Sequence, residues 1–252
     1  MPRHAREKSR SGIYHLIIRG INKQNIFEDD EDKQKFIDTL GYYKIVSNYM
    51  LYGYCLMDNH IHLLIRENDE SISKVIKRIS SSYVYWYNQK YERCGHLFQE
   101  RFKSEVVETD PYFIVVLRYI HQNPLKAGMT KDIRKYLWSS YQEYIGTPTV
   151  VNIDFVLDIF SVDRRSAVEL FRTYTNEKTT DECLDYKESV NLSDKEVMDY
   201  LQQEGIGTIS QLQRLKKDNR DEIIRKMKEM QGITIRQLAR MTGISKSGID
   251  RT

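Results

Sequence analysis

The sequence has few cysteines, and none of them are close together. Cys55, Cys94 and Cys183 are widely spaced, odd in number and without a CxxC pair. A disulfide framework needs an even set of cysteines, and a zinc knuckle needs CxxC pairs, so the sequence suggests neither. It also contains no GxxxxGK[ST] sequence, so no phosphate-binding loop of a nucleoside triphosphatase is expected.

Long apolar runs are also missing. The chain has 252 residues, 40% hydrophobic and 30% charged, which is typical of a folded protein. Its apolar segments are too short to span a bilayer, and no apolar segment follows the basic start MPRHAREKSRSG, so no secretory signal is expected. We therefore expect a cytoplasmic protein without a membrane partner.

The positive charge lies mainly at the two ends of the chain. Six basic residues and one acidic residue occur between Met1 and Gln24, and eleven basic and five acidic residues between Gln211 and Thr252. Basic ends suit contact with nucleic acid phosphates, although charge alone equally fits a solvated surface without a partner. The candidate DNA contacts are Arg3, Arg6, Lys8 and Arg10 at the first end, and Arg236, Arg240, Lys246 and Arg251 at the second.

Strand and helix patterns alternate in the first part of the chain. Apolar periodicity predicts strands over Ile13–Arg19, Leu51–Met57 and His60–Arg66, helices over Asp30–Asn48 and Ser71–Arg93, an extended pair within Gly95–Glu108 and a helix from Asp110 to Asn123. Proline disrupts helix interiors, so Pro124 should end the last helix. This order predicts an α+β sandwich, with helices on the faces of a mainly antiparallel sheet.

Beyond Trp138 the strand patterns largely stop and short helices are expected. The polar stretch Thr175–Ser193 indicates a linker. We therefore predict an α+β domain over residues 1–146, a helical extension and linker over 147–193, and an all-α domain over 194–252.

Two histidines stand one residue apart in a predicted strand. Residues i and i+2 of a strand point to the same face, so His60 and His62 should lie side by side. Two neighbouring imidazoles form a natural half of a metal site. The pair alone is weak support, because two polar residues on a solvent-facing strand would look the same.

The predicted helix before Pro124 carries a tyrosine and an amide on one face. Tyr119 and Asn123 are four positions apart, whereas His121 points elsewhere. An amide oxygen can complete a hard-metal coordination shell, and a phenol beside the metal can act as a nucleophile. Alternatively, Tyr119 packs in the core and Asn123 caps the helix.

The segments MDNHIHLLI and RYIHQNPLKAGM together resemble the HUH single-strand transposases, in particular the REP-associated tyrosine transposases. Three further segments are similar to that family and occur in the family order: YHLIIRGINKQNIFEDDEDKQKF, GHLFQERFKS and WSSYQEYIG. The resemblance covers roughly Arg3 to Gly146, so residues 1–146 would be the catalytic domain.

The resemblance implies a ferredoxin-like or RRM-like fold. It also implies that His60, His62 and Asn123 bind a divalent metal, Mg²⁺ or Mn²⁺, although insertion-sequence relatives often carry glutamine at the position of Asn123. Tyr119 would attack a DNA phosphate, forming a 5′-phosphotyrosine and freeing a 3′-hydroxyl. The substrate would be single-stranded or hairpin DNA, possible targets being REP-like palindromes, and the enzyme a monomer or homodimer.

The sequence near the C-terminus indicates a helix-turn-helix. Thr234 and Ser245 can cap two helices, Ala239 is small where the helices would cross, and Gly243 falls at the turn. A helical hairpin for dimer contact is the alternative. This region also motivates a second hypothesis, a sequence-specific regulator with a silent HUH domain. A third is a metal-dependent nuclease that uses water in place of tyrosine.

Overall fold

The computed structural model describes residues 6–99, 101–185, 194–230 and 233–252. The chain forms two compact units, residues 1–185 and residues 186–252, and each has its own apolar core. The boundaries predicted at residues 146 and 193 remain predictions. The helices that follow residue 146 in the first unit belong to the same compact body as the sheet.

The first unit is built on a four-stranded antiparallel sheet. Its strands are β1 (Ile13–Arg19), β2 (Met50–Leu56), β3 (His60–Arg66) and β4 (Lys103–Val106), in the spatial order β2-β3-β1-β4. The central strand β1 pairs with β3 along its whole length and with β4 on its other side. With one helix after β1 and another after β3, the chain order is that of a ferredoxin-like sandwich, which confirms the predicted fold class.

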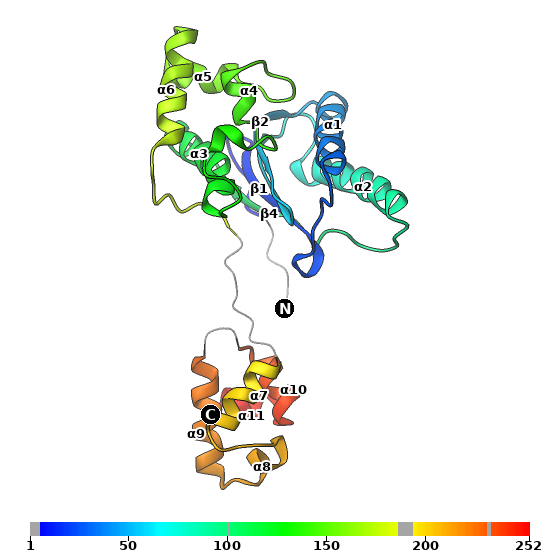
Figure 1. Ribbon diagram of the computed structural model, residues 1–252, viewed down its shortest axis with the longest axis vertical. Coiled ribbons are helices and arrows are strands. Elements are labelled where there is room, and N and C mark those ends of the chain that lie inside the picture. The colour runs from blue at the N-terminus through cyan, green and yellow to red at the C-terminus, as the bar shows by residue number, and fades with distance from the viewer. Residues whose placement is uncertain (1–5, 100, 186–193, 231–232) are drawn as a thin grey trace. The chain divides into compact units, whose positions relative to one another are not determined.

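Two long helices cover one face of the sheet (Figure 1). Helix α1 (Asp30–Ser47) begins with a capping box, in which the side chains of Asp29 and Asp32 each accept a hydrogen bond from the other residue's backbone N–H. Helix α2 (Ile72–Lys90) buries one apolar side, including Val75, Ile79 and Tyr83. The buried side chains of both helices form part of the apolar core.

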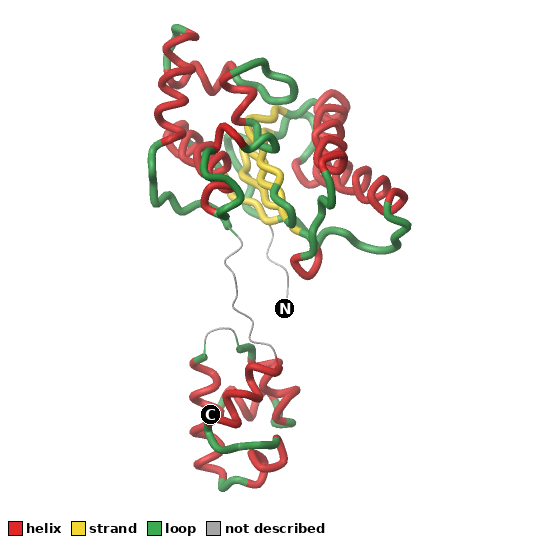
Figure 2. Tube along the Cα trace, in the orientation of Figure 1, coloured by secondary structure: helices red, strands yellow, loops and turns green. Residues whose placement is uncertain are grey.

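Helix α3 (Asp110–Lys126) covers the opposite face, so that the sheet lies between two helical layers (Figure 2). Thr109 caps its first turn, where Pro111 needs no hydrogen-bond partner. A Cβ atom on Gly53 of β2 would lie 2.6 Å from Cδ1 of Leu117, so glycine at this position allows α3 to pack closely on the sheet. This contact fixes the height of α3 above β2 and β3.

Helix α3 continues past Pro124 and ends at Lys126, so the prediction that Pro124 ends it was wrong. Proline removes one backbone donor but does not prevent the following residues from donating helical hydrogen bonds. The N–H of Ala127 donates to the carbonyl of Asn123, and the N–H of Met129 donates to that of Pro124. The extended pair predicted within Gly95–Glu108 is only partly present, as strand β4 and a single bridge between Gly20 and Phe98.

Three shorter helices and two 3-10 turns complete the first unit. The helices are α4 (Tyr141–Ile145), α5 (Asp154–Phe160) and α6 (Arg164–Asn176), and the turns are η1 (Ile21–Lys23) and η2 (Ile133–Lys135). Phe171 of α6 stacks on Tyr144 of α4 with ring centroids 4.5 Å apart. Phe171 also packs edge-on against His121 of α3, so aromatic packing joins α4 and α6 to the helix that covers the sheet.

The second unit is all-helical. Its helices are α7 (Asp194–Gln203), α8 (Ile209–Arg214), α9 (Lys217–Glu229), α10 (Ile235–Thr242) and α11 (Lys246–Asp250). Its core includes Val197, Leu212, Met227, Leu238 and Ile249. Between α10 and α11 the chain turns at Gly243, whose φ of 72° is strained for a residue with a Cβ. The predicted helix-turn-helix-like region is consistent with this arrangement.

None of the helices in the described ranges combines the length and the apolar composition that crossing a membrane requires.

Candidate active site

The two histidines of the HIH segment lie on the sheet face that α3 covers. Their ring centroids are 5.0 Å apart. His62 is fully buried in the middle of β3, whereas His60 at the start of the strand is partly exposed, with Nδ1 2.7 Å from Oδ1 of Asn59. One ring is therefore fixed by packing and the other stands at the edge of the site, where a ligand can approach.

Helix α3 places Tyr119 over these histidines. Its ring centroid lies 5.9 Å from that of His62. Asn123, one helical turn further along, donates from Nδ2 to the backbone carbonyl of Tyr119 at 3.0 Å, which holds its amide next to the tyrosine. The structure thus brings together the four residues that the sequence singled out from two distant segments.

A third histidine, which the sequence analysis did not assign to the site, completes the cluster. Nε2 of His15 on β1 lies 3.0 Å from Nδ1 of His62, and its ring centroid lies 5.9 Å from that of Tyr119. On its other side, Nδ1 of His15 is 3.5 Å from a carboxylate oxygen of Glu105 on β4. Three neighbouring strands therefore contribute one polar side chain each to a continuous row of contacts. Only the strand pairing shows that these residues are neighbours.

Burial keeps the histidines neutral. It lowers the pKa of His62 well below its usual value, and the nearby histidines add to this effect. Burial also lowers the pKa of His60 to about 4, although the charge of Asp185 opposes the shift. Imidazoles that are neutral at pH 7 can bind a metal through the lone pair of a ring nitrogen.

Comparisons with known proteins agree with this geometry. A sequence profile of the family described as "Transposase IS200 like" matches residues 8–123. This range contains all of the strands, the three histidines and Tyr119. We call residues 8–123 the IS200-like domain because they are similar to this family.

One relative of the IS200-like domain is a Haemophilus influenzae protein described as a REP-associated tyrosine transposase. It is 23% identical over 156 residues, which are 56% of this chain and 86% of the relative. A solved structure, of a REP-associated tyrosine transposase bound to a REP hairpin, has a TM-score of 0.51 at 14% identity and covers 61% of this chain and 96% of that one. At this identity the solved structure supports the fold alone.

The histidine side of the IS200-like domain fits a metal ion in one respect. Nε2 of His62 is buried and has no hydrogen-bond partner in the described parts of the chain. Those parts contain no group of three histidine, cysteine or acidic side chains that could hold an ion. A metal at His60 and His62 would therefore need an amide oxygen, such as that of Asn123, or oxygens of the substrate.

The environment of Tyr119 holds its phenol protonated. Burial raises the pKa of Tyr119 well above its usual value, and the negative charge of Asp185 raises it further. A smaller contribution from the side chain of Asn123 lowers it. The tyrosine therefore does not ionise by itself near neutral pH and needs a positive charge or a proton acceptor to act as a nucleophile.

The segment that brings Asp185 to the site is tied to α3 and β4. Arg118 pairs with Asp181 at 2.8 Å, and its guanidinium lies 4.0 Å from the ring centroid of Tyr174. The N–H of Leu184 donates to the Glu105 carboxylate at 3.1 Å. The first part of the polar stretch predicted as a linker, up to Asp185, is thus packed against the IS200-like domain.

His121 has a structural position away from the site, as its place on the helix predicted. Its Nε2 lies 2.8 Å from Oγ of Ser140, and its ring packs edge-on against the rings of Tyr141, Tyr144 and Phe171. Burial lowers the pKa of His121 to about 3. It is therefore a neutral core residue.

The predicted DNA contacts occupy different settings. Arg3 lies outside the described residues, Lys8 and Arg10 are exposed, and Arg6 lines a pocket beside α2. In the second unit Arg236, Arg240, Lys246 and Arg251 are all exposed. Arg240 pairs with Asp194 at 2.7 Å, and Nε of Arg251 donates to the Ser247 carbonyl at 2.8 Å. Arg236 and Lys246 are thus the better candidates for phosphate contacts.

Proposed function

We propose that this protein cleaves and rejoins single-stranded or hairpin DNA through a 5′-phosphotyrosine intermediate on Tyr119. The observation that carries the proposal is the position of Tyr119, whose ring lies 5.9 Å from those of both His62 and His15. A purely structural tyrosine would not need three histidines and a neighbouring amide around it. The match of residues 8–123 to the IS200-like transposase profile supports the same reading.

In the proposed reaction the phenolic oxygen of Tyr119 forms a bond to the phosphorus of a DNA phosphodiester. The bond from phosphorus to the 3′ oxygen breaks, the phenol loses its proton, and the freed 3′ oxygen gains one. The strand then remains attached through its 5′ phosphate. Because the phosphotyrosine keeps the energy of the phosphodiester, attack by a 3′-hydroxyl rejoins DNA without ATP.

A divalent ion would be held by His60, His62 and Asn123. When bound, Mg²⁺ or Mn²⁺ would supply positive charge beside the phosphate and stabilise the negative charge that develops on its oxygens. Two observations support this arrangement: Nε2 of His62 has no hydrogen-bond partner among the described residues, and burial lowers the pKa of His60. His15 would act by orienting the His62 ring.

The preferred substrate would be an unpaired strand or a hairpin with an unpaired flank, including REP-like palindromes. Burial of Tyr119 supports this preference, because a thin single strand reaches a recessed tyrosine more easily than a stiff duplex does. The basic second unit would add contacts to DNA phosphates and place the protein on the nucleoid, as a monomer or a homodimer.

Two other functions use the same domain differently. A regulator with a silent transposase domain would bind DNA through its helical unit and form no covalent product. A nuclease that uses water would cleave DNA but leave the protein unmodified. The assembled set of His60, His62, Tyr119 and Asn123 favours the tyrosine reaction over both, because neither alternative requires all four.

The test is a search for a covalent product. The full chain is incubated with Mn²⁺ or Mg²⁺ and a hairpin that carries an unpaired flank and a fluorescent label on the 3′ side of the cleavage site. We expect label to migrate with the protein on a denaturing gel, to be absent in EDTA and to be weak with blunt duplex. Cleaved DNA without labelled protein would instead support the water-dependent nuclease.

A further inference from the structure

A cavity opens on the other face of the sheet. Its volume is about 400 Å³, and it lies between α2 and the GHLFQERFKS segment that precedes and enters β4. Ile18 of β1 lines it, whereas His15 points to the face of Tyr119 because residues three apart in a strand face opposite sides. This pocket is therefore separate from the candidate active site.

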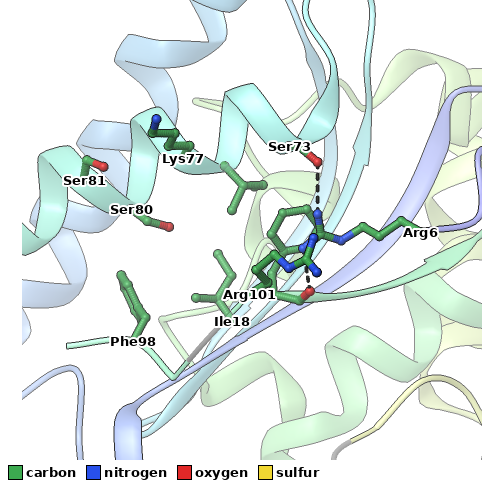
Figure 3. A pocket seen from close by; sticks show the side chains of 10 residues that line it. Arg6, Ile18, Ser73, Lys77, Ser80, Ser81, Phe98 and Arg101 are labelled. Carbon is green, nitrogen blue, oxygen red and sulfur yellow. Dashed lines mark hydrogen bonds between the residues drawn. The ribbon is translucent and has the colours of Figure 1, made fainter. Parts of the chain in front are cut away.

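Positive charge gathers in the pocket. Arg6, Lys77 and Arg101 line it together with serines 73, 80 and 81, and no acidic side chain is among its lining residues in the described ranges. In Figure 3 the guanidinium groups of Arg6 and Arg101 lie next to each other. Burial and the charge of Arg101 together lower the pKa of Arg6. Two adjacent cations repel each other, so an anion between them would be stabilised.

One of these cations is held in place. Arg6 donates to Oγ of Ser73 at 3.0 Å and to the carbonyl of Phe102 at 3.1 Å, and its guanidinium carbon lies 3.6 Å from the centroid of the Phe102 ring. The contacts join the N-terminal segment to α2 and to the start of β4. An arginine that is already oriented loses little conformational entropy when it binds a ligand.

The remaining wall of the pocket is apolar. Ile18 and Ile76 are buried at its base, and the ring of Phe98 is only partly covered. Figure 3 shows Phe98 and Ile18 across the cavity from Ser80 and Ser81 of α2. An exposed aromatic face beside arginines suits an unpaired base whose phosphate is bound next to it. The volume lies within the range of small-molecule sites, which is enough for one nucleotide and too small for a duplex.

We propose that this pocket binds a single unpaired nucleotide of the DNA substrate, with its phosphate against Arg6 and Arg101 and its base against Phe98. The inference rests on the proposed function only in taking DNA as the ligand. It gives the GHLFQERFKS segment a role in recognition, and it places a strand on the sheet face opposite Tyr119.

Binding is measured on the full chain carrying Tyr119→Phe, with a labelled strand that has 5-iodouracil at successive unpaired positions. Irradiation should crosslink one position to the peptide that contains Phe98 and Phe102. Phe98→Leu should abolish that crosslink and leave the salt dependence unchanged. Arg101→Gln should weaken binding about fivefold at 0.1 M salt, because each phosphate contact to a single strand contributes about 0.7 to the salt slope.

The matched control is Arg165→Gln, which removes one exposed positive charge from α6, far along the chain from the pocket segments, and should change neither property. Competition with inorganic phosphate and with a tetrathymidylate separates the two anion sources. The tetrathymidylate should compete at the lower concentration. Equal competition with no effect of Phe98→Leu, or crosslinks only to other peptides, would overturn the proposal.

These outcomes do not depend on the cleavage reaction. If the wild-type chain forms no covalent product but the crosslink maps to the pocket, the proposed function fails and the nucleotide pocket stands. If the covalent product forms while Arg101→Gln and Phe98→Leu bind DNA like the parent, the pocket proposal fails and the proposed function stands.

Discussion

Nε2 of His15 and Nδ1 of His62 lie 3.0 Å apart across the paired strands β1 and β3. One of the two nitrogens must donate and the other accept, so this contact couples the tautomers of the two rings, while Nε2 of His62 has no hydrogen-bond partner in the described parts of the chain. Glu105 lies 3.5 Å from the other nitrogen of His15 and extends this row of contacts to β4. Such outer partners commonly orient metal-binding imidazoles.

Loss of this support should weaken metal binding. His15→Gln removes the ring that orients His62 but keeps a polar side chain in a buried position. We expect Mn²⁺ affinity, measured by calorimetry on the DNA-free protein, to fall about 10- to 100-fold, the usual effect of removing an outer partner. His96→Gln, at an exposed histidine, is the control. Unchanged affinity in His15→Gln would show that His15 does not position a metal ligand.

Asp185 should disfavour the ionised form of Tyr119, the proposed nucleophile. Burial first and the charge of Asp185 second raise the pKa of Tyr119, so Asp185→Asn should lower that pKa and increase the covalent product several-fold at pH 8. The pH profile of product formation should shift to lower pH. Glu182→Gln, at an exposed acid in the same segment, should leave the profile unchanged. A slower reaction in Asp185→Asn would show instead that this carboxylate assists the tyrosine.

Local patterns predicted much of this molecule. The strands Ile13–Arg19 and His60–Arg66 have the predicted ends, because each is a short apolar pattern bounded by polar residues or glycine. Pro124 misled the prediction, since a helix can continue for one more turn through the carbonyls that precede a proline. The local sequence does not show whether a helix ends at a proline or continues past it in this way.

The candidate site was predictable only where its residues are close in sequence. His60 and His62 share a face because they are two positions apart in one strand. Tyr119 and Asn123 share a face because they are four positions apart in one helix. His15, Glu105 and Asp185 join the cluster through strand pairing and through the packing of a polar segment on α3. The pocket of Arg6 and Arg101 likewise depends on contacts between distant segments.

His121 should make stability depend on pH. Its pKa is about 3 in the folded protein, lowered by burial from 6.5, so below pH 6.5 the unfolded chain binds more protons than the folded one. Its contribution is complete above pH 6.5 and is lost as pH falls, by about 1.4 kcal/mol per pH unit. In urea titrations between pH 6.5 and 4, His121→Gln should show a shallower fall in the free energy of unfolding. An unchanged slope would mean that His121 is not a buried neutral group.

The second unit should add DNA affinity without taking part in catalysis. It has its own apolar core, and none of the proposed catalytic residues lies in it. A chain ending at Ser193 should still form the covalent product on a short hairpin but bind long DNA more weakly, with a shallower salt dependence. If the unit is instead a dimerisation arm, truncation would change the mass in solution and leave the salt slope unaltered.

The central claim is that Tyr119 is the nucleophile, and Tyr119→Phe tests it most directly. Phenylalanine keeps the ring beside His15 and His62 and removes only the attacking oxygen. With a 3′-labelled hairpin and Mn²⁺, we predict no labelled protein on a denaturing gel, while hairpin affinity stays within about twofold of the wild type, since only a hydroxyl is lost. Covalent labelling of the Tyr119→Phe protein at the wild-type level would contradict the account.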